Sequence, residues 1–314
     1  MLKQIIFSCL FGLYAMTAFA GNNNDKKAEV VQIVPLVQFE SLNLSSQQIR
    51  SNSAGFMINR EDLMFTGVYT QHRFGEPLQH GFPRLYHSID MLLDVKNERH
   101  QYLGIFKSAS DQPVCGGINT YQAAAVYGYE MINRPNLSLV LGGGLAVGNF
   151  GVETSDGKNW PLIPVPLLRM NHHTDWLDTS FEFITSPNLS FILAPKGNVR
   201  LCGDFRMDQS RDARDLIYEV ALSYHPYSEQ DERGDFVGIS IGFKNDNYGE
   251  FNLGNQGEDE TLEVHYKSLF AAVDVSVLKF TAGYAFDGRA LYRGTEKQDL
   301  GEGYYASVQA MYPF

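Results

Sequence analysis

The chain has 314 residues, of which 36 are acidic and 25 are Lys or Arg, and its formal net charge is −11. This balance argues against a nucleic-acid-binding protein, because affinity for nucleic acid is built on Lys and Arg. Beyond the first twenty residues, no stretch approaches the roughly 18 uninterrupted apolar residues of a membrane helix, so no such helix is expected there.

The first twenty residues have the pattern of an export signal. Lys3 provides a positive start, an apolar run covers 5–19, and Ala18-Phe19-Ala20 is a small-x-small cleavage site. The run is shorter than the about 20 residues that a membrane helix needs. We therefore expect residues 1–20 to be a cleaved signal peptide and residues 21–314 to form a single domain; an uncleaved anchor is the alternative.

From residue 30 onward, apolar and polar residues alternate with period two, which is the pattern of half-buried β-strands. The clearest examples, in chain order, are 89–95, 177–184, 216–224, 262–267 and 278–286. Each window runs about ten residues, the length of a tilted membrane strand. The apolar faces carry Tyr and Phe near strand ends, as an interfacial girdle would, and the polar faces carry full charges, as a wet lumen would.

The connections between these strands alternate between short and long. Short turns are expected at 97–99, 133–136, 172–176, 195–198 and Asp274, and long loops at 74–82, 108–118, 149–159, 208–214, 245–260 and 287–302. Outer-membrane barrels have short periplasmic turns and longer outer loops. We predict an all-β fold: a transmembrane antiparallel up-and-down β-barrel of about 14 strands, with roughly 12 to 16 possible, because 53–58 and 189–193 are weak candidates.

The end of the chain carries a motif. Phe314 is terminal, and Tyr312, Ala310 and Val308 share its face of the last strand. This resembles the C-terminal assembly signal of bacterial outer-membrane β-barrel proteins, and the resemblance implies insertion by the outer-membrane assembly machinery. Pro313 departs from the pattern, because it cannot donate a ladder hydrogen bond.

The centre of the chain, 162–205, resembles an uncharacterised family of outer-membrane-like barrels. The matching features are the run 164–168, the turn Thr174-Asp175-Trp176 and the triplet Ser186-Pro187-Asn188. That resemblance implies no activity and no catalytic residues.

The charged residues on the polar strand faces are the candidate lumen lining. They are Asp90, Asp94, Glu130, Asp178, Glu182, Arg200, Asp204, Glu219, Glu263, Lys267 and Lys279. Acidic residues outnumber basic ones, so an open lumen should prefer cations or small polar solutes. In a closed barrel the same residues would form an ion-pair network. Cys115 and Cys202 are expected to form a disulfide in an oxidising compartment, which would pin the 108–118 loop into the barrel.

Three functions stay open: a pore or transport channel, a closed structural or surface-interaction barrel with acidic external loops, and a lipid-modifying enzyme. His173 with Ser180 or Ser186 would be the pair for the enzyme, but no hydrolase motif accompanies it, and we expect no enzymatic activity. His172 and His173 point to opposite sides of a strand, so no metal site and no cofactor are expected. The acidic residues around 245–260 are interpreted as a solvated loop rather than a calcium site.

The expected partners are outer-membrane lipids and lipopolysaccharide, the latter through the mixed-charge segment 204–215, together with the assembly machinery. The sequence leaves the oligomeric state open.

Overall fold

The computed structural model describes residues 31–76, 82–150, 162–207, 216–226, 237–253, 261–292 and 296–311. The expected signal peptide, Tyr312 and Phe314 lie outside these residues. Among the described residues, no helix is long and apolar enough to cross a membrane.

The described residues form one closed antiparallel barrel of 16 strands, in which each strand pairs with its sequence neighbours and β16 pairs with β1. The strands are β1 (Gln32–Leu44), β2 (Gln48–Arg60), β3 (Leu63–Phe74), β4 (Leu85–Asn97), β5 (His100–Ser110), β6 (Tyr121–Arg134), β7 (Leu137–Gly148), β8 (Leu162–His173), β9 (Leu177–Phe183), β10 (Pro187–Leu193), β11 (Val199–Met207), β12 (Leu216–Tyr224), β13 (Val237–Asn252), β14 (Thr261–Val275), β15 (Leu278–Tyr292) and β16 (Glu296–Met311). A short 3-10 helix (Ile118–Thr120) precedes β6.

The predicted all-β barrel is confirmed, but the expected number of about 14 strands is wrong, since the barrel has 16. The two weak candidates are real strands, β2 and β10. The inner face of β2 carries the small or polar residues Ser51, Ser53 and Gly55. These residues weaken the alternation of apolar and charged residues by which a strand is recognised in the sequence. Strand β10 has only 7 residues, so its pattern is too short to stand out.

The two ends of the barrel differ in their connections. At one end, here called the turn end, the strands are joined by 61–62, 98–99, 135–136, 174–176, 194–198 and 276–277. The opposite end is called the loop end. Two of the long loops expected there are largely strand: β13 continues to Asn252, and β15 and β16 stay paired as far as Tyr292 and Glu296. The wall is therefore tall at β13–β16 and low at β9–β10.

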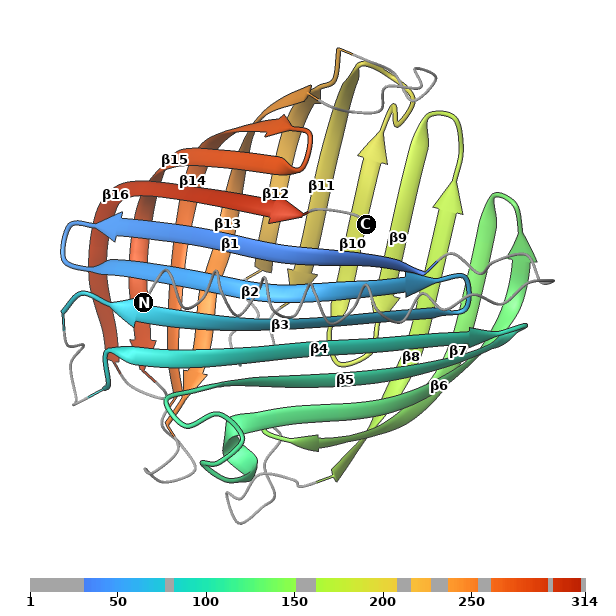
Figure 1. The fold of residues 1–314 in the computed structure, drawn as a ribbon, viewed down its shortest axis with the longest axis horizontal. Helices are drawn as coiled ribbons and strands as arrows, with labels where there is room; N and C mark the ends of the chain where they lie inside the picture. Colours follow the sequence, from blue (N-terminus) through green and yellow to red (C-terminus); the bar gives the residue numbers. More distant parts are fainter. Residues whose placement is uncertain are drawn as a thin grey trace, which may run out of the picture. The chain divides into compact units, whose positions relative to one another are not determined.

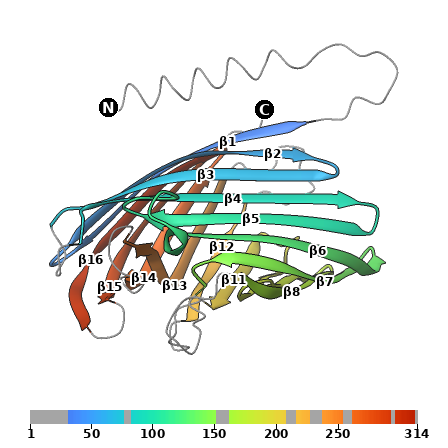
Figure 2. The same cartoon turned by 90° about the horizontal axis from the view of Figure 1, so that it is seen from below.

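The sheet folds back on itself, so that β1–β5 lie in front of β9–β14 and cross them steeply (Figure 1). The turned view shows the same two layers, with β6–β8 at the bend that joins them (Figure 2). Gly142 and Gly144 of β7 make close approach possible at this bend, because a Cβ on either residue would collide with the backbone oxygen of Tyr127 or Ala125.

The outer face of the barrel is apolar along most of its strands. Ile241, Leu269 and Phe280 leave 59%, 57% and 44% of their surface uncovered. Val308 and Ala310 of β16 share this face, since they pair with Phe39 and Val37 of β1.

Seven aromatic side chains form a continuous row around the outer face of β10–β13, β15 and β16, here called the aromatic row. Consecutive ring centroids lie 5.7–6.4 Å apart. The row consists of Phe191, Phe205, Tyr218, Phe243, Phe286, Tyr284 and Tyr304.

Beyond the aromatic row, toward the loop end, the polarity of the two faces reverses. On β14, Leu262, Val264 and Tyr266 point inward and are almost fully buried, whereas Leu269 and Val273 point outward and are exposed. Apolar residues thus occupy even positions in one part of the strand and odd positions in the other. Strands β1–β4 show the same change, and together these strands enclose a dry cluster, here called the loop-end core. It includes Leu42, Leu44, Ile49, Phe74, Phe82, Tyr86, Phe251, Leu262, Val264, Tyr266, Tyr292, Leu300 and Tyr305.

Candidate functional site: the barrel interior

Most of the charged residues proposed from the sequence as lumen lining lie on the inner face. Strand register puts Asp90 opposite Lys107, Asp204 opposite Glu219, and Lys279 opposite Asp274. The inner-face members of the predicted set are Asp90, Asp94, Glu130, Asp178, Glu182, Arg200, Asp204, Glu219 and Lys279.

Glu263 and Lys267 are a correction, because both lie on the outer face of β14. Glu263 is opposite Glu250 and Leu291, and Lys267 is opposite Phe286 in the aromatic row. Lys267 donates to Asp287 on the same face at 2.6 Å. The inner positions at this level belong to the loop-end core, where an unpaired charge would lose its hydration without compensation. The assumption that polar faces always point inward therefore fails past the aromatic row.

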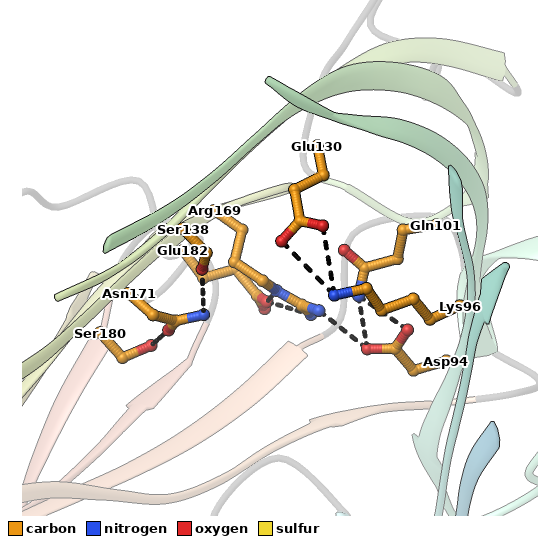
Figure 3. Close-up of polar contacts among 9 residues, drawn as sticks. All are labelled: Asp94, Lys96, Gln101, Glu130, Ser138, Arg169, Asn171, Ser180 and Glu182. Atoms are coloured by element: carbon orange, nitrogen blue, oxygen red, sulfur yellow. Dashed lines mark hydrogen bonds and ion pairs between the residues drawn. The ribbon is translucent and has the colours of Figure 1, made fainter. Parts of the chain in front are cut away.

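An ion-pair network fills the interior near the turn end (Figure 3). Arg169 of β8 donates from Nη1 to Asp94 of β4 at 2.8 Å and from Nε to Glu182 of β9 at 2.6 Å. Gln101 adds a 2.7 Å hydrogen bond to Asp94. The guanidinium side chain is only 17% exposed. Arg169 binds one carboxylate from each layer of the folded sheet. This cluster therefore links the two layers across the interior near the bend.

Lys96 and Glu130 extend this network. The Lys96 ammonium lies 3.3 Å from Glu130 Oε2, and the Glu130 side chain is nearly buried. Ser138, Asn171 and Ser180 form a separate short hydrogen-bonded chain nearby on β7, β8 and β9 (Figure 3). Paired charges of this kind offer little net field to a passing solute.

The carboxylates of Asp204 and Glu219 differ from those in the network. They are direct neighbours across β11 and β12, and among the described residues no ion pair is formed by either one. Like charges directly opposite in a sheet oppose folding. Both line a cavity of about 540 Å³ near the turn end, together with Asp178. This cavity, here called the vestibule, therefore has an acidic wall.

Two further cavities lie in the interior. A small one, of about 110 Å³, is lined by Glu219, Lys244 and Lys279. Glu219 is shared with the vestibule, so the two cavities adjoin. The second, of about 360 Å³, is lined by Asp90 and Lys107 on one layer and Arg206 on the other. We call it the upper cavity.

The sequence reasoning missed Arg169 of the network and also missed the interior pair of Lys244 and Asp246. The Lys244 ammonium lies 2.9 Å from Asp246 and 3.9 Å from the centroid of the Tyr305 ring, a cation–π contact. Arg206 approaches Asp246 at 3.5 Å. The outward-facing residues Val237, Ile239, Ile241 and Phe243 alternate along β13, and the same alternation predicts inward-facing side chains at 244 and 246. The predicted loop 245–260 ends this strand too early.

The predicted disulfide is wrong, since Cys115 and Cys202 are both free thiols. Cys115 lies in the connection between β5 and β6 at the loop end, whereas Cys202 lines the vestibule near the turn end. The barrel wall separates the two residues along its height, which a disulfide cannot span.

The histidines of β8 have ordinary partners. His172 and His173 point to opposite faces, and His173 contacts Asp178. Among the described residues, no hydrogen bond joins His173 to Ser180 or Ser186, and no group of three His, Cys, Asp or Glu side chains could hold a metal ion. Ser180 donates to Asn171 instead, at 2.8 Å. The segments 208–215 and 254–260, which include most of the predicted lipopolysaccharide and calcium candidates, lie outside the described residues.

No known protein family matches the chain, and no curated protein is similar enough in sequence to match it. Among solved structures, the barrel is similar to OccAB3 of Acinetobacter baumannii, with 8% identity, a TM-score of 0.41, and coverage of 92% of this chain and 100% of that one. It is also similar to OccAB4 of the same organism (9% identity, TM-score 0.36, coverage 92% and 100%). A third is OccK8 (OprE) of Pseudomonas aeruginosa (10%, 0.34, 92% and 99%). These values are too low to carry a conclusion about what this chain does, and the resemblance of 162–205 to a barrel family stays a prediction.

Proposed function

We propose that the chain is an outer-membrane β-barrel whose interior conducts small polar or cationic solutes. The observation that carries the proposal is the opposition of two surfaces on the same strands. The outer face is apolar over β5–β16 below the aromatic row, while the inner face carries charges that line a succession of cavities. Hydrocarbon outside and water inside is the environment that this arrangement fits.

The aromatic residues support a membrane setting for the outer face. The aromatic row would mark one membrane boundary, and His100, Tyr102, Tyr127 and Tyr129 would mark the other, since they cluster on the outer face near the turn end. Aromatic girdles at both interfaces are a feature of membrane barrels. The turn end would face the periplasm, and export by the signal peptide, insertion by the assembly machinery and contact with lipopolysaccharide belong to the same proposal.

The acidic vestibule supports the cation preference. Asp204 and Glu219 form no ion pair among the described residues, although Lys244 lies opposite Glu219 across β12 and β13, so the two carboxylates would present their charge to a solute entering from the turn end. In contrast, the carboxylates of Asp94 and Glu182 are held by Arg169. Selectivity should therefore depend on the first pair much more than on the second.

The test is conductance of the purified protein in a planar bilayer under a KCl gradient. We expect discrete current steps and a reversal potential of cation-selective sign. The double variant Asp204→Asn with Glu219→Gln should lower the ratio of K⁺ to Cl⁻ permeability. Asp287→Asn removes the same type of charge from the outer face, where Asp287 accepts a hydrogen bond from Lys267, and should leave that ratio unchanged.

Absence of current above that of a mock preparation would overturn the channel proposal and favour a closed barrel. The loop-end core is the observation that favours a closed barrel, because its buried side chains fill part of the interior. Current with an anion-selective sign would keep the channel and reject the role of the vestibule.

A further inference from the structure

One strand of the barrel leaves the wall and crosses the interior. Strand β13 has a bulge between Asn247 and Gly249, and beyond it Asn252 pairs in parallel with Ser110 of β5. Strands β5 and β13 are otherwise separated in the wall by β6–β12. The pairing therefore closes a second, smaller ring at the loop end, made of β1–β5 and β13–β16.

Asn252 is the junction of this crossing. Its Oδ1 accepts a hydrogen bond from Asn149 Nδ2, at the end of β7, at 3.2 Å. It also accepts one from Thr261 Oγ1, at the start of β14, at 2.9 Å. The side chain thus ties the far end of β13 both to its own hairpin and to the opposite wall.

Aromatic packing fills the smaller ring behind this crossing. The Phe251 ring contacts Tyr86 at a centroid distance of 4.7 Å, His72 at 4.9 Å and Phe74 at 5.9 Å. Phe251 and Val264 have no exposed surface. A ring packed at this density has no room for a hydrated solute.

Hydrogen bonds complete the crossing on its other side. The Tyr248 hydroxyl bonds Ser51 of β2, Ser51 bonds His72 Nδ1 at 2.8 Å, and His72 Nε2 bonds Ser88 of β4 at 2.9 Å. Tyr248, His72 and Ser88 also line the upper cavity. The same side chains therefore form the wall between the packed ring and the open cavity.

We infer that the β13 segment Tyr248–Asn252 is a partition that seals the smaller ring and leaves the upper cavity, between β4–β6 and β10–β13, as the passage for solute at the loop end. This inference rests on the proposed channel and names the element that sets its size. The passage is lined by charges of both signs, from Asp90, Lys107 and Arg206. It should therefore select solutes by size and polarity, whereas the vestibule should select them by charge.

Thiol labelling in membranes tests the partition without measuring current. In a background in which Cys9, Cys115 and Cys202 are replaced by Ser, single cysteines replace Thr70, which lines the upper cavity, or Val264, which lies in the smaller ring. A small, charged methanethiosulfonate is the probe. We expect Thr70→Cys to react roughly tenfold faster or more, because an apolar, buried thiol ionises poorly. Equal rates, or no reaction at either position, would overturn the partition.

Two variants then open the wall in the Val264→Cys background. Phe251→Ala removes the central ring, and Asn252→Ala removes the junction without touching the packed ring. Either should raise the labelling rate of Cys at 264 in barrels that still migrate as folded protein. Labelling that stays slow in both would overturn the inference. If no variant conducts yet the labelling contrast holds, the channel proposal fails and the partition stands.

Discussion

The two parts of strand β14 differ in which face of the strand carries the apolar residues. At the level of the aromatic row and below it, Leu269 and Val273 face outward and Ser268 and Asp274 face inward. Above it, Leu262 and Val264 are buried inside while Glu263 faces outward. Bulges interrupt the pairing on both sides of β14 near this change, between Asn247 and Gly249 of β13 and between His265 and Lys267 of β14, yet the inner positions of β14 remain even-numbered. In the membrane setting that we propose, hydrocarbon would lie outside one part of the strand and water outside the other.

That difference has a structural consequence at the loop end. A barrel segment with water outside can be stabilised by a dry centre, as in a soluble protein, because burial of apolar surface from water is then favourable. A segment with hydrocarbon outside gains nothing by exchanging one apolar medium for another. The proposed membrane setting would therefore explain why the loop-end core lies at the loop end of β1–β4 and β13–β16, beyond the level of the aromatic row.

The largest expected effect is in the loop-end core. Phe251→Ala should lower the free energy of unfolding by about 4 kcal/mol, the cost of a cavity at a fully buried Phe. Phe280→Ala removes the same ring from the outer face and should cost clearly less. Equilibrium unfolding in urea, with both proteins in lipid vesicles, measures the two values. Equal losses would contradict the assignment of a dry core to one region only.

The next effect is in the ion-pair network at the bend. Arg169→Ala leaves Asp94 and Glu182 without their shared cation and should cost about 3 kcal/mol, the lower end for a broken buried pair. Lys196→Ala breaks the exposed pair with Asp175 and should change stability too little to resolve in the same assay. A small loss for Arg169→Ala would show that water reaches this part of the interior freely.

A pair of identical substitutions then maps the boundary on the outer face. Leu222→Lys places a charge among lipid-facing residues below the aromatic row, opposite Ile241, and should destabilise the folded barrel by about 2 kcal/mol or more. Leu291→Lys makes the same change above the aromatic row, opposite Glu263, and should be nearly neutral. Urea unfolding in vesicles compares them. A cost at Leu291 as large as that at Leu222 would place the membrane boundary above the aromatic row.

The smallest effect is a pH response in a turn. The Arg60 guanidinium donates to Asp62 at 2.5 and 2.6 Å, and these hydrogen bonds hold the pKa of the Asp62 carboxyl below its ordinary value of 3.8. Because the folded-state pKa is lowered, the stabilising contribution is present above pH 3.8 and is lost as the pH falls through the lowered pKa. Carboxyl ¹³C NMR should show the Asp62 pKa rising in Arg60→Ala, and an unchanged titration would refute the pairing.

Much of the barrel could be predicted from the sequence because its signals are local. Period-two alternation identifies strands, and the short connections 97–99, 133–136 and 195–198 identify one end. The inward position of Asp90, Asp178 and Glu219 follows from the same alternation. The change of phase in β14 is also visible in the sequence, since apolar residues move from 262, 264 and 266 to 269, 271 and 273, but the prediction uses only the window 262–267 and assigns its polar face to the lumen.

The order of residues alone predicts an all-β chain with one apolar and one charged face per strand, because side chains alternate about an extended backbone. The closed barrel is needed to tell which face is interior at each height, where β13 meets β5, and which carboxylates share Arg169. These depend on contacts such as Asn252 with Ser110 and Arg169 with Asp94. The partners are far apart in the chain and meet only when the barrel closes, so no local pattern encodes their pairing.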